Sequence, residues 1–86
     1  MFARIFVHPR VNQKRPNIAN EDVIHAWNNA IIVSSRLSDP PDYYAAAGMD
    51  SKGRMLELVG VELEDGVLMI IHAMKLTKKM INELGL

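Results

Sequence analysis

The sequence predicts an α+β fold in which two helices cover one face of a mainly antiparallel sheet of four to five strands. Two observations lead to this prediction. Five short segments rich in β-branched, aromatic or small apolar residues are separated by turn residues, and two further segments carry apolar residues at helical spacing. The chain has 86 residues, of which 49% are hydrophobic and 23% charged, so we expect residues 1–86 to form a single globular domain.

The first third of the chain is expected to contain a strand, a loop and a helix. Residues 2–7 are rich in Phe, Ile and Val and end before a proline, which is typical of a short edge strand. Residues 8–19 contain two prolines, two asparagines and several basic residues, which indicates a loop with room for one helical turn. A helix is predicted over residues 21–30. Its apolar face comprises Val23, Ala26, Trp27 and Ala30, and its opposite face, expected to lie in water, comprises Asp22, His25, Asn28 and Asn29.

The rest of the chain is expected to form an antiparallel meander followed by a second helix. The predicted strands cover residues 31–37, 43–49, 54–63 and 67–74. Turn residues separate the last three of these strands. The second helix is predicted over residues 78–84, with Thr77 as its N-cap and Gly85 as its end. If both helices cover one face of the sheet, the other face is available for function.

The charges balance over the whole chain but not along it. Ten basic side chains match ten acidic ones, so the net charge does not by itself indicate a nucleic-acid-binding protein. Residues 1–36 carry five basic and two acidic side chains, residues 37–65 two and seven, and residues 66–86 three and one. Two interpretations are open. The basic ends form one surface if the fold brings them together, or the charges form an ordinary solvated surface.

Several classes of protein are not expected. Without cysteine the chain has neither disulfides nor a thiolate metal site. Its three histidines lack metal-ligand spacing, and it has no nucleotide-binding loop, so we expect no metal ion and no cofactor. No apolar run reaches the length of a membrane span, and charged residues interrupt the first segment too early for a signal peptide. We therefore expect a cytoplasmic protein with no membrane contact.

His72 interrupts the apolar run of the last predicted strand. On strict alternation it shares its face with Leu68 and Ile70. Two interpretations are open: a buried, hydrogen-bonded histidine of the core, or a group that transfers protons at the rim of a site.

Lys75, Lys78 and Lys79 surround the start of the last predicted helix. Lysines in the first turn oppose the helix dipole at a cost of about 0.3–1 kcal/mol each at low salt. They either bind phosphate groups together with the helix N-terminus or extend into solvent, and the sequence favours neither interpretation.

Several local features occur in a familiar order. They are the basic pair Lys14-Arg15 before an amphipathic helix, the segment 43–48, the turn ending in Gly53-Arg54, and the run 70–77 before the last helix. In this order and spacing, from residue 14 to the C-terminus, the sequence resembles the BrnT-type ribonuclease toxins. These are small members of the RelE-like superfamily, found in bacterial toxin–antitoxin pairs.

The sequence departs from that family at three places. The family commonly has Lys-His where this chain has Lys14-Arg15. It commonly has Ser-Ala-Arg where this chain has His72-Ala73-Met74, so a basic residue is missing at position 74. A tyrosine of the family's central strand corresponds to Gly60 when the turn at Gly53-Arg54 serves as the anchor.

The resemblance implies a RelE-like fold, metal-independent cleavage of RNA that inhibits growth, and an antitoxin protein as partner. We assign His72 as acid or base, and Arg54 and Lys75 as groups that stabilise phosphate charge. The residues assigned to RNA binding are Lys78, Lys79, Tyr43, Tyr44, Lys14 and Arg15. The two tyrosines are equally well explained as ordinary sheet residues.

The small size of the domain favours association, because little surface is buried when so short a chain folds. A homodimer or a toxin–antitoxin hetero-oligomer is therefore expected. The competing class is a catalytically inactive, toxin-like interaction module that binds a partner through its exposed sheet face.

Overall fold

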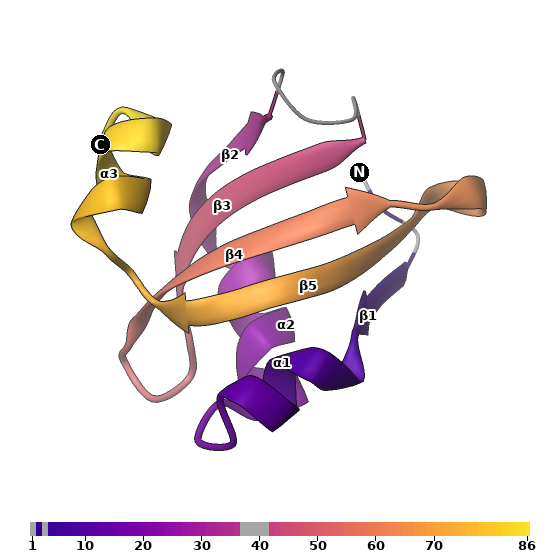
Figure 1. Ribbon diagram of the computed structural model, residues 1–86, viewed down its shortest axis with the longest axis horizontal. Helices are drawn as coiled ribbons and strands as arrows, with labels where there is room; N and C mark the ends of the chain where they lie inside the picture. The colour runs from indigo at the N-terminus through magenta and orange to yellow at the C-terminus, as the bar shows by residue number, and fades with distance from the viewer. Residues whose placement is uncertain (1, 3, 37–41) are drawn as a thin grey trace.

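The computed structural model describes residues 2, 4–36 and 42–86, which form a five-stranded sheet and three α-helices (Figure 1). The strands are β1 (Arg4–Val7), β2 (Ala30–Ser35), β3 (Tyr43–Met49), β4 (Met55–Glu62) and β5 (Val67–Lys75), and the helices are α1 (Pro9–Lys14), α2 (Asn20–Asn28) and α3 (Lys78–Leu84). The predicted α+β class is confirmed, and β3 and α3 have the predicted bounds. The predicted strands also included residues 3 and 37, which lie outside the described residues.

The strand order in the sheet is β1-β5-β4-β3-β2. Strands β2 to β5 form the predicted antiparallel meander. β1 lies at an edge, as predicted, but it pairs parallel to β5, with Arg4 opposite Val67 and Val7 opposite Ile70. The sheet is therefore mixed, because the chain leaves β1 at one edge and passes through α1 and α2 before it enters β2 at the other. Within the described part of the chain, none of the helices has the length and apolar character of a membrane span.

Helices lie on both faces of the sheet. α2 covers one face, where the main core contains Trp27 and Leu58, and α1 lies beside β5 with Val11 in the same core. α3 lies against the other face, which we call the open face, with Met80 and Leu84 packed near Ala47. The prediction that both helices cover one face is therefore wrong for α3. It covers only one end of the open face, so the middle of β4 and β5 is not covered by a helix (Figure 1).

α1 occupies a segment that was predicted to be mainly a loop. The Nδ1 atom of His8 accepts a hydrogen bond from the backbone N–H of Arg10 at 3.0 Å and caps the helix. Pro9 fits the first turn because its missing N–H would have no partner there. Val11 is buried in the main core and fixes the helix beside β5. Histidine is not a common N-cap, so no start signal was recognisable in the sequence.

α2 buries its predicted apolar face against the sheet. Val23 and Ala26 are fully buried, and Trp27 is 8% exposed. The helix approaches β3 so closely that a Cβ atom at Gly48 would overlap the carbonyl oxygen of Ala26. Asp22, which was predicted to lie in water, is buried because residues of the β3–β4 turn bind its carboxylate.

A β-bulge in β5 sets the direction of His72. Val59 of β4 pairs with His72 and Gly60 pairs with Ile70, so Ile71 has no residue opposite it. Because of this extra residue, His72 faces the open side with Val59, while Ile70 is fully buried in the main core. The prediction that His72 shares its face with Ile70 is therefore wrong.

Gly60 faces the main core. A Cβ atom there would lie 2.8 Å from Cδ1 of Leu68 and 3.2 Å from Cδ1 of Ile70. A tyrosine at this position would meet the core instead of the open face.

Candidate active site

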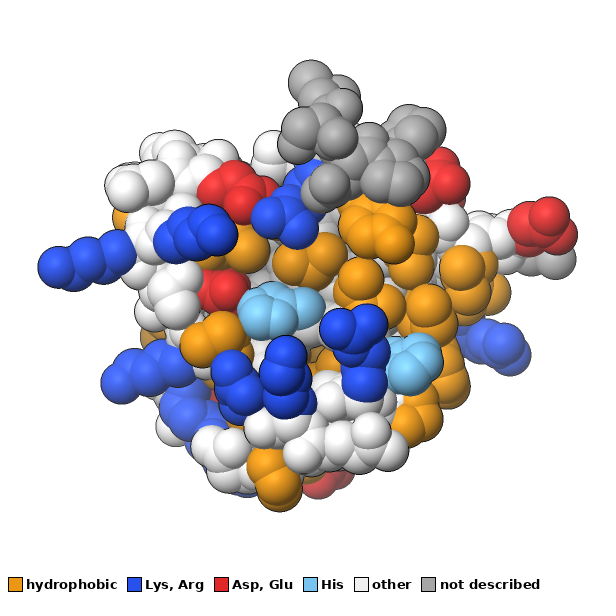
Figure 2. Space-filling view, in the orientation of Figure 1, with side chains coloured by type: hydrophobic (Ala, Val, Ile, Leu, Met, Phe, Trp, Pro, Cys, Tyr) orange, Lys and Arg blue, Asp and Glu red, His pale blue; other side chains and the backbone are white. Residues whose placement is uncertain are grey.

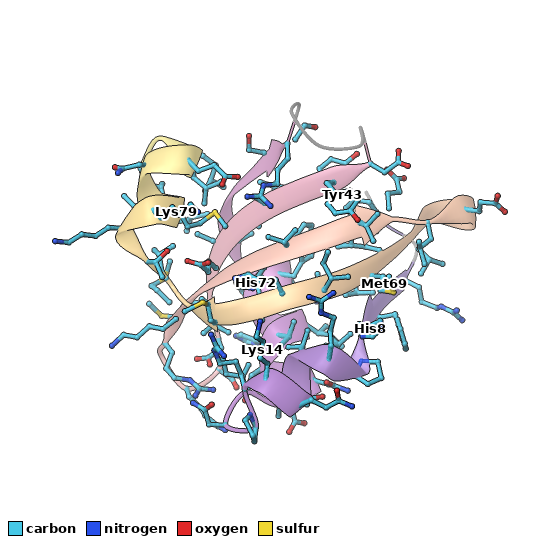
Figure 3. All side chains as sticks on the ribbon, in the orientation of Figure 1. His8, Lys14, Tyr43, Met69, His72 and Lys79 are labelled. Carbon is cyan, nitrogen blue, oxygen red and sulfur yellow. The ribbon has the colours of Figure 1, made fainter. Side chains whose placement is uncertain are left out.

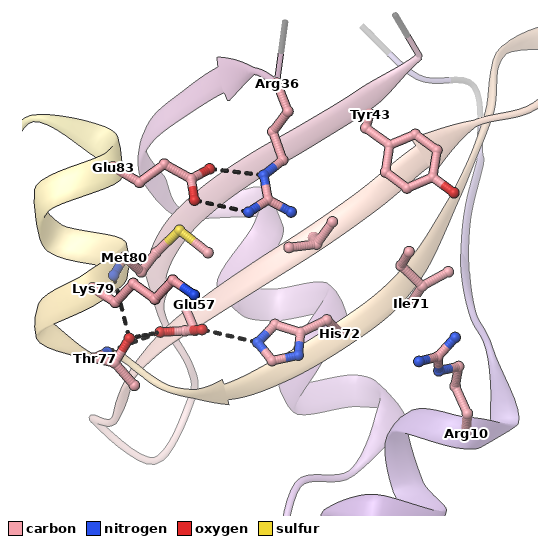
Figure 4. Close-up of a pocket in the computed structure, with 11 residues that line it drawn as sticks. Arg10, Arg36, Tyr43, Glu57, Ile71, His72, Thr77, Lys79, Met80 and Glu83 are labelled. Atoms are coloured by element: carbon pink, nitrogen blue, oxygen red, sulfur yellow. Dashed lines mark hydrogen bonds and ion pairs between the residues drawn. The ribbon is translucent and has the colours of Figure 1, made fainter. Parts of the chain in front are cut away.

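A hollow of about 440 Å³ lies on the open face (Figure 4). Strands β3, β4 and β5 form its floor, α3 borders it on one side, and the start of α1 borders it on the other. Its lining residues are Arg10, Arg36, Tyr43, Glu57, Val59, Ile71, His72, Thr77, Lys79, Met80 and Glu83. Distant parts of the chain thus bring cationic, acidic and aromatic side chains and an imidazole into one space.

Glu57 and His72 form the polar centre of the hollow. Oε2 of Glu57 lies 2.9 Å from Nε2 of His72. Oε1 of Glu57 accepts hydrogen bonds from the backbone N–H of Thr77 at 2.9 Å and from its hydroxyl at 2.6 Å. The Glu57 side chain is 7% exposed and the His72 side chain 37%. The carboxylate is therefore fixed below the surface, and the imidazole extends from it toward the solvent.

The charge of Glu57 determines which nitrogen of His72 can act as a base. Burial alone would raise the pKa of Glu57, but hydrogen bonds from Thr77 and His72 outweigh it, so the pKa lies below its usual value of 4.5. An ionised carboxylate only accepts hydrogen bonds, so Nε2 of His72 carries a hydrogen. Nδ1 of the neutral imidazole then has a free electron pair. Among the described residues, no group forms a hydrogen bond with Nδ1, so it is available to a ligand.

Cationic side chains surround this pair. Nε and Nη2 of Arg36 each lie 2.8 Å from a carboxylate oxygen of Glu83, which fixes the guanidinium above the hollow (Figure 4). Arg10 enters from α1 and Lys79 from α3, and neither forms an ion pair with a described carboxylate. Figure 2 shows several lysine and arginine side chains on the middle and lower part of this face. The hollow therefore suits an anionic ligand.

Tyr43 and Tyr44 face opposite sides of the sheet because they are neighbours in β3. Tyr43 lines the hollow, on the same face as His72 (Figure 3). The ring of Tyr44 packs edge-on against Phe2, with 5.6 Å between ring centroids. Its hydroxyl donates to Glu62 at 3.1 Å, which raises the pKa of Tyr44. Only the first of these two tyrosines is therefore placed to stack on a ligand in the hollow.

Arg54 does not line the hollow, because its donors are used in an ion network at the β3–β4 turn. Its Nε lies 2.7 Å from Asp50, its Nη2 lies 3.3 Å from Asp22, and its Nη1 donates to the carbonyl oxygen of Asn17 at 3.1 Å. Nζ of Lys52 also lies 3.3 Å from Asp22. The network joins α2 to the β3–β4 turn, and it places the predicted phosphate-stabilising residue away from His72.

We expect this network to make stability depend on pH. Burial alone would raise the pKa of Asp22 and Asp50, but hydrogen bonds and neighbouring cations outweigh it, so both values lie below the usual 3.8. A carboxyl group whose pKa is lowered by folding stabilises the protein above its unfolded pKa, and this contribution is lost as the pH falls through the folded pKa. Urea unfolding should therefore show a free energy of unfolding that falls below about pH 4.

The matched control for this prediction is Asp22→Asn. The variant should be less stable than the wild type at neutral pH by about 1–3 kcal/mol, because the cations around the amide lose a charged partner. It should also lose less stability than the wild type on acidification. An identical pH dependence in both proteins would contradict the role given to Asp22.

Lys14 and Arg15 lie next to the hollow. They line a small notch between α1 and β5, to which His72 also contributes (Figure 3). Nη2 of Arg15 lies 3.5 Å from Sδ of Met74 on β5. The basic pair singled out in the sequence therefore lies beside the predicted catalytic histidine.

The lysines at the start of α3 separate into two groups. Lys79 lines the hollow, whereas Lys75 and Lys78 are exposed and do not. Thr77 caps the helix through its hydroxyl, as predicted, and also donates two hydrogen bonds to Glu57. A buried carboxylate thus supplies negative charge at the start of α3, which offsets part of the repulsion between the lysines and the helix dipole.

Four charged residues of the hollow, Arg10, Arg36, Glu57 and Glu83, were not singled out in the sequence. Glu57 interrupts the apolar run of residues 55–61, and a buried carboxylate requires partners, so its position was an available signal. Arg10 lies in a segment predicted to be mainly a loop. Arg36 follows β2 without any local pattern, so nothing in the sequence placed it near His72.

Comparisons of the chain with protein-family models, curated proteins and solved structures found no match. The resemblance to BrnT-type toxins and the RelE-like fold therefore stay predictions. Within the described ranges, no three His, Cys, Asp or Glu side chains gather in a way that could hold a metal ion.

Proposed function

We propose that this protein is a metal-independent ribonuclease that acts as the toxin of a toxin–antitoxin pair. One observation carries the proposal: a histidine held by a buried carboxylate extends into a hollow lined by cations and a tyrosine ring. Metal-free cleavage of RNA requires a base for the 2′-hydroxyl, a proton for the leaving oxygen and positive charge near the phosphate. The resemblance to BrnT-type toxins supports the same class.

In this mechanism His72 acts as the base. Its Nδ1 removes the proton of a 2′-hydroxyl, the 2′-oxygen forms a bond to the adjacent phosphorus, and the bond from phosphorus to the 5′-oxygen breaks. The leaving 5′-oxygen takes a proton from water in the open hollow. The products end in a 2′,3′-cyclic phosphate and a 5′-hydroxyl. Glu57 stabilises the imidazolium that forms and keeps the ring in the productive tautomer.

The other groups of the hollow bind the RNA. Arg10 and Lys79 reach the hollow from different helices and stabilise the charge that develops on the phosphate. Tyr43 stacks on a base next to the cleaved bond, as aromatic side chains commonly do with single-stranded RNA.

Two positions that depart from the BrnT pattern, Arg15 and Met74, are in contact, so the charge missing at one is supplied by the other. The resemblance implies a basic side chain at position 74, which Met74 does not supply. The guanidinium of Arg15 contacts the sulfur of Met74 at 3.5 Å, so a positive charge is present at this end of β5. His72 in turn supplies the imidazole that the family carries at position 15.

The purified protein is expected to cut single-stranded RNA in the presence of EDTA, because side chains and water supply every group in this mechanism. Glu57→Gln should lower kcat by about 10²-fold and change KM little. The amide oxygen can still accept from Thr77, but the amide nitrogen then faces Nε2 of His72 and favours the tautomer with a hydrogen on Nδ1. Cleavage of a labelled oligonucleotide measures both constants.

Glu62→Gln is the control for this variant. It makes the same chemical change on the same strand, at a carboxylate that binds Tyr44 outside the hollow. Its kcat should equal that of the wild type. A folded wild-type protein that cuts no RNA would overturn the ribonuclease proposal.

The edge strand β2 favours a second candidate function, a protein-interaction module. Edge strands commonly carry charged residues that prevent association, but β2 has none. Ile31 and Val33 are 65% and 47% exposed. An extended segment of an antitoxin, or a second copy of the chain, could add to this edge. A neighbouring antitoxin gene together with RNA cleavage would favour the toxin, and an isolated gene without cleavage would favour the module.

A further inference from the structure

A small notch continues the hollow along β5. It measures about 40 Å³, lies between α1 and β5, and shares Arg10, Ile71 and His72 with the hollow. Lys14 and Arg15 also line it. A space of this size holds a few waters or a phosphate group, but no base.

A wider depression follows the notch. It measures about 240 Å³ and shares Arg15 with the notch, and Arg54 lines it together with Met74 and Lys75 of β5. Wide and narrow spaces therefore alternate along β5, and consecutive spaces share a basic residue. A single nucleic-acid strand has a matching alternation of bulky bases and compact phosphates.

Arg36 and Arg54, which lie at the two ends of this path, are paired with carboxylates, but the other lysine and arginine side chains along it are not neutralised. Among the described residues, no carboxylate forms an ion pair with Arg10, Lys14, Arg15 or Lys75. The guanidinium of Arg15 is held instead by the carbonyl oxygen of Lys14 at 3.2 Å and by Sδ of Met74 at 3.5 Å. These neutral contacts orient the group and leave its charge available to a polyanion.

We propose that Lys14 and Arg15 form a second subsite, which binds the phosphate adjacent to the cleaved one in a single-stranded nucleic acid. The inference rests on the proposed function, which assigns the cleaved phosphate to His72. Met74 follows His72 by two residues on the same face of β5, a separation of about 6.6 Å, which is comparable to one nucleotide step. Arg15, in contact with Met74, therefore lies where the neighbouring phosphate arrives.

Binding of single-stranded DNA tests this subsite separately from cleavage, because DNA lacks the 2′-hydroxyl. The probes are a fluorescent hexanucleotide and a dinucleotide, measured by anisotropy over a salt series. The logarithm of the binding constant falls as the logarithm of the salt concentration rises. Each lost phosphate contact makes this negative slope shallower by about 0.7 for a single strand. With the hexanucleotide, Lys14→Gln and Arg15→Gln should each make the slope shallower by about this amount. Neither should change the binding of the dinucleotide, which has a single internucleotide phosphate.

Arg4→Gln is the matched control. Arg4 is exposed on β1 and pairs with Val67, at the opposite end of β5 from the path. The variant removes the same charge and should keep the wild-type slope. An unchanged slope in Lys14→Gln and Arg15→Gln would overturn the second subsite. A slope that becomes equally shallow in Arg4→Gln would overturn it too.

The failure of this inference can be distinguished from the failure of the proposed function. If the slopes change as expected but the wild type cuts no RNA, the subsite stands and the ribonuclease proposal fails. If the wild type cuts RNA and the slopes do not change, the ribonuclease proposal stands and the subsite fails. If an acidic peptide such as hexaglutamate binds and the DNA hexanucleotide does not, the path is a protein-binding surface and the subsite is overturned.

Discussion

Replacing His72 by alanine is expected to lower the rate of RNA cleavage by up to about 10⁴-fold, because the variant loses the base that accepts the 2′-hydroxyl proton. The fold should remain intact, since the side chain of His72 is 37% exposed and lies outside the main core. Glu57 keeps both hydrogen bonds from Thr77 in the variant. Cleavage of labelled RNA and thermal unfolding of the same preparation measure the two effects.

The same substitution is expected to relieve growth arrest. Produced without a partner, the wild-type protein should arrest bacterial growth, and His72→Ala should not. His25→Ala is the control, because His25 is exposed on α2, on the covered side of the sheet. If His72→Ala cuts RNA as fast as the wild type, the catalytic assignment is wrong, and Arg10 and Tyr43 become the next residues to replace. A folded wild type that neither cuts RNA nor slows growth would favour the interaction module.

Trp27→Ala is expected to lower the free energy of unfolding by about 3–5 kcal/mol. Trp27 is 8% exposed in the main core, and its ring meets Phe2 edge-on with 6.0 Å between centroids. Removal of the indole leaves a cavity between α2 and the sheet and also removes this aromatic contact. A domain is typically stable by only about 5–15 kcal/mol, so the loss is a large part of the total. Urea unfolding followed by circular dichroism measures it.

A smaller ring should restore part of this stability. Trp27→Phe keeps the contact with Phe2 and fills much of the cavity, so it should cost less than Trp27→Ala. The two variants need to be compared at one pH, because the network around Asp22 also contributes to stability. If Trp27→Ala unfolds at the same urea concentration as the wild type, the packing of α2 against the sheet is wrong.

Elements whose ends carry local signals could be predicted from the sequence. β3 has the predicted bounds because turn residues separate it from the next strand. α3 has the predicted bounds because Thr77 and Gly85 cap the helix. α1 was predicted to be mainly a loop because its cap is the unusual residue His8. Local signals therefore determined most of the elements but not the faces on which they pack.

The features that could not be predicted depend on contacts between distant residues. Asp22 resembles a solvated residue of a helix N-terminus, but it binds Arg54, which lies far along the chain. Strict alternation placed His72 on the face of Leu68 and Ile70, and the bulge opposite Gly60 placed it on the open face. The position of α3 required Met80 to pack on the side of the sheet opposite α2.

The candidate site was predicted in part. His72, Tyr43 and Lys79 line the hollow, and Lys14 lies in the adjoining notch. These four residues were predicted from their charge or side-chain chemistry and from the family resemblance. Glu57 was missed because one acidic residue within an apolar run forms no motif.

The bulge in β5 also gives the strand two consecutive residues that lie outside the main core. In a regular strand every second side chain must fit the interior, so a substitution next to a catalytic residue often affects folding. Ile71 and His72 both face the open side, whereas Ile70 and Ala73 on either side of them are buried in the main core. Ile71 is only partly buried, against the smaller cluster beneath α3, so replacing it should cost less stability than replacing Ile70 or Ala73. Selection for a new ligand preference would therefore meet less constraint from folding at the residue beside the imidazole than at its buried neighbours.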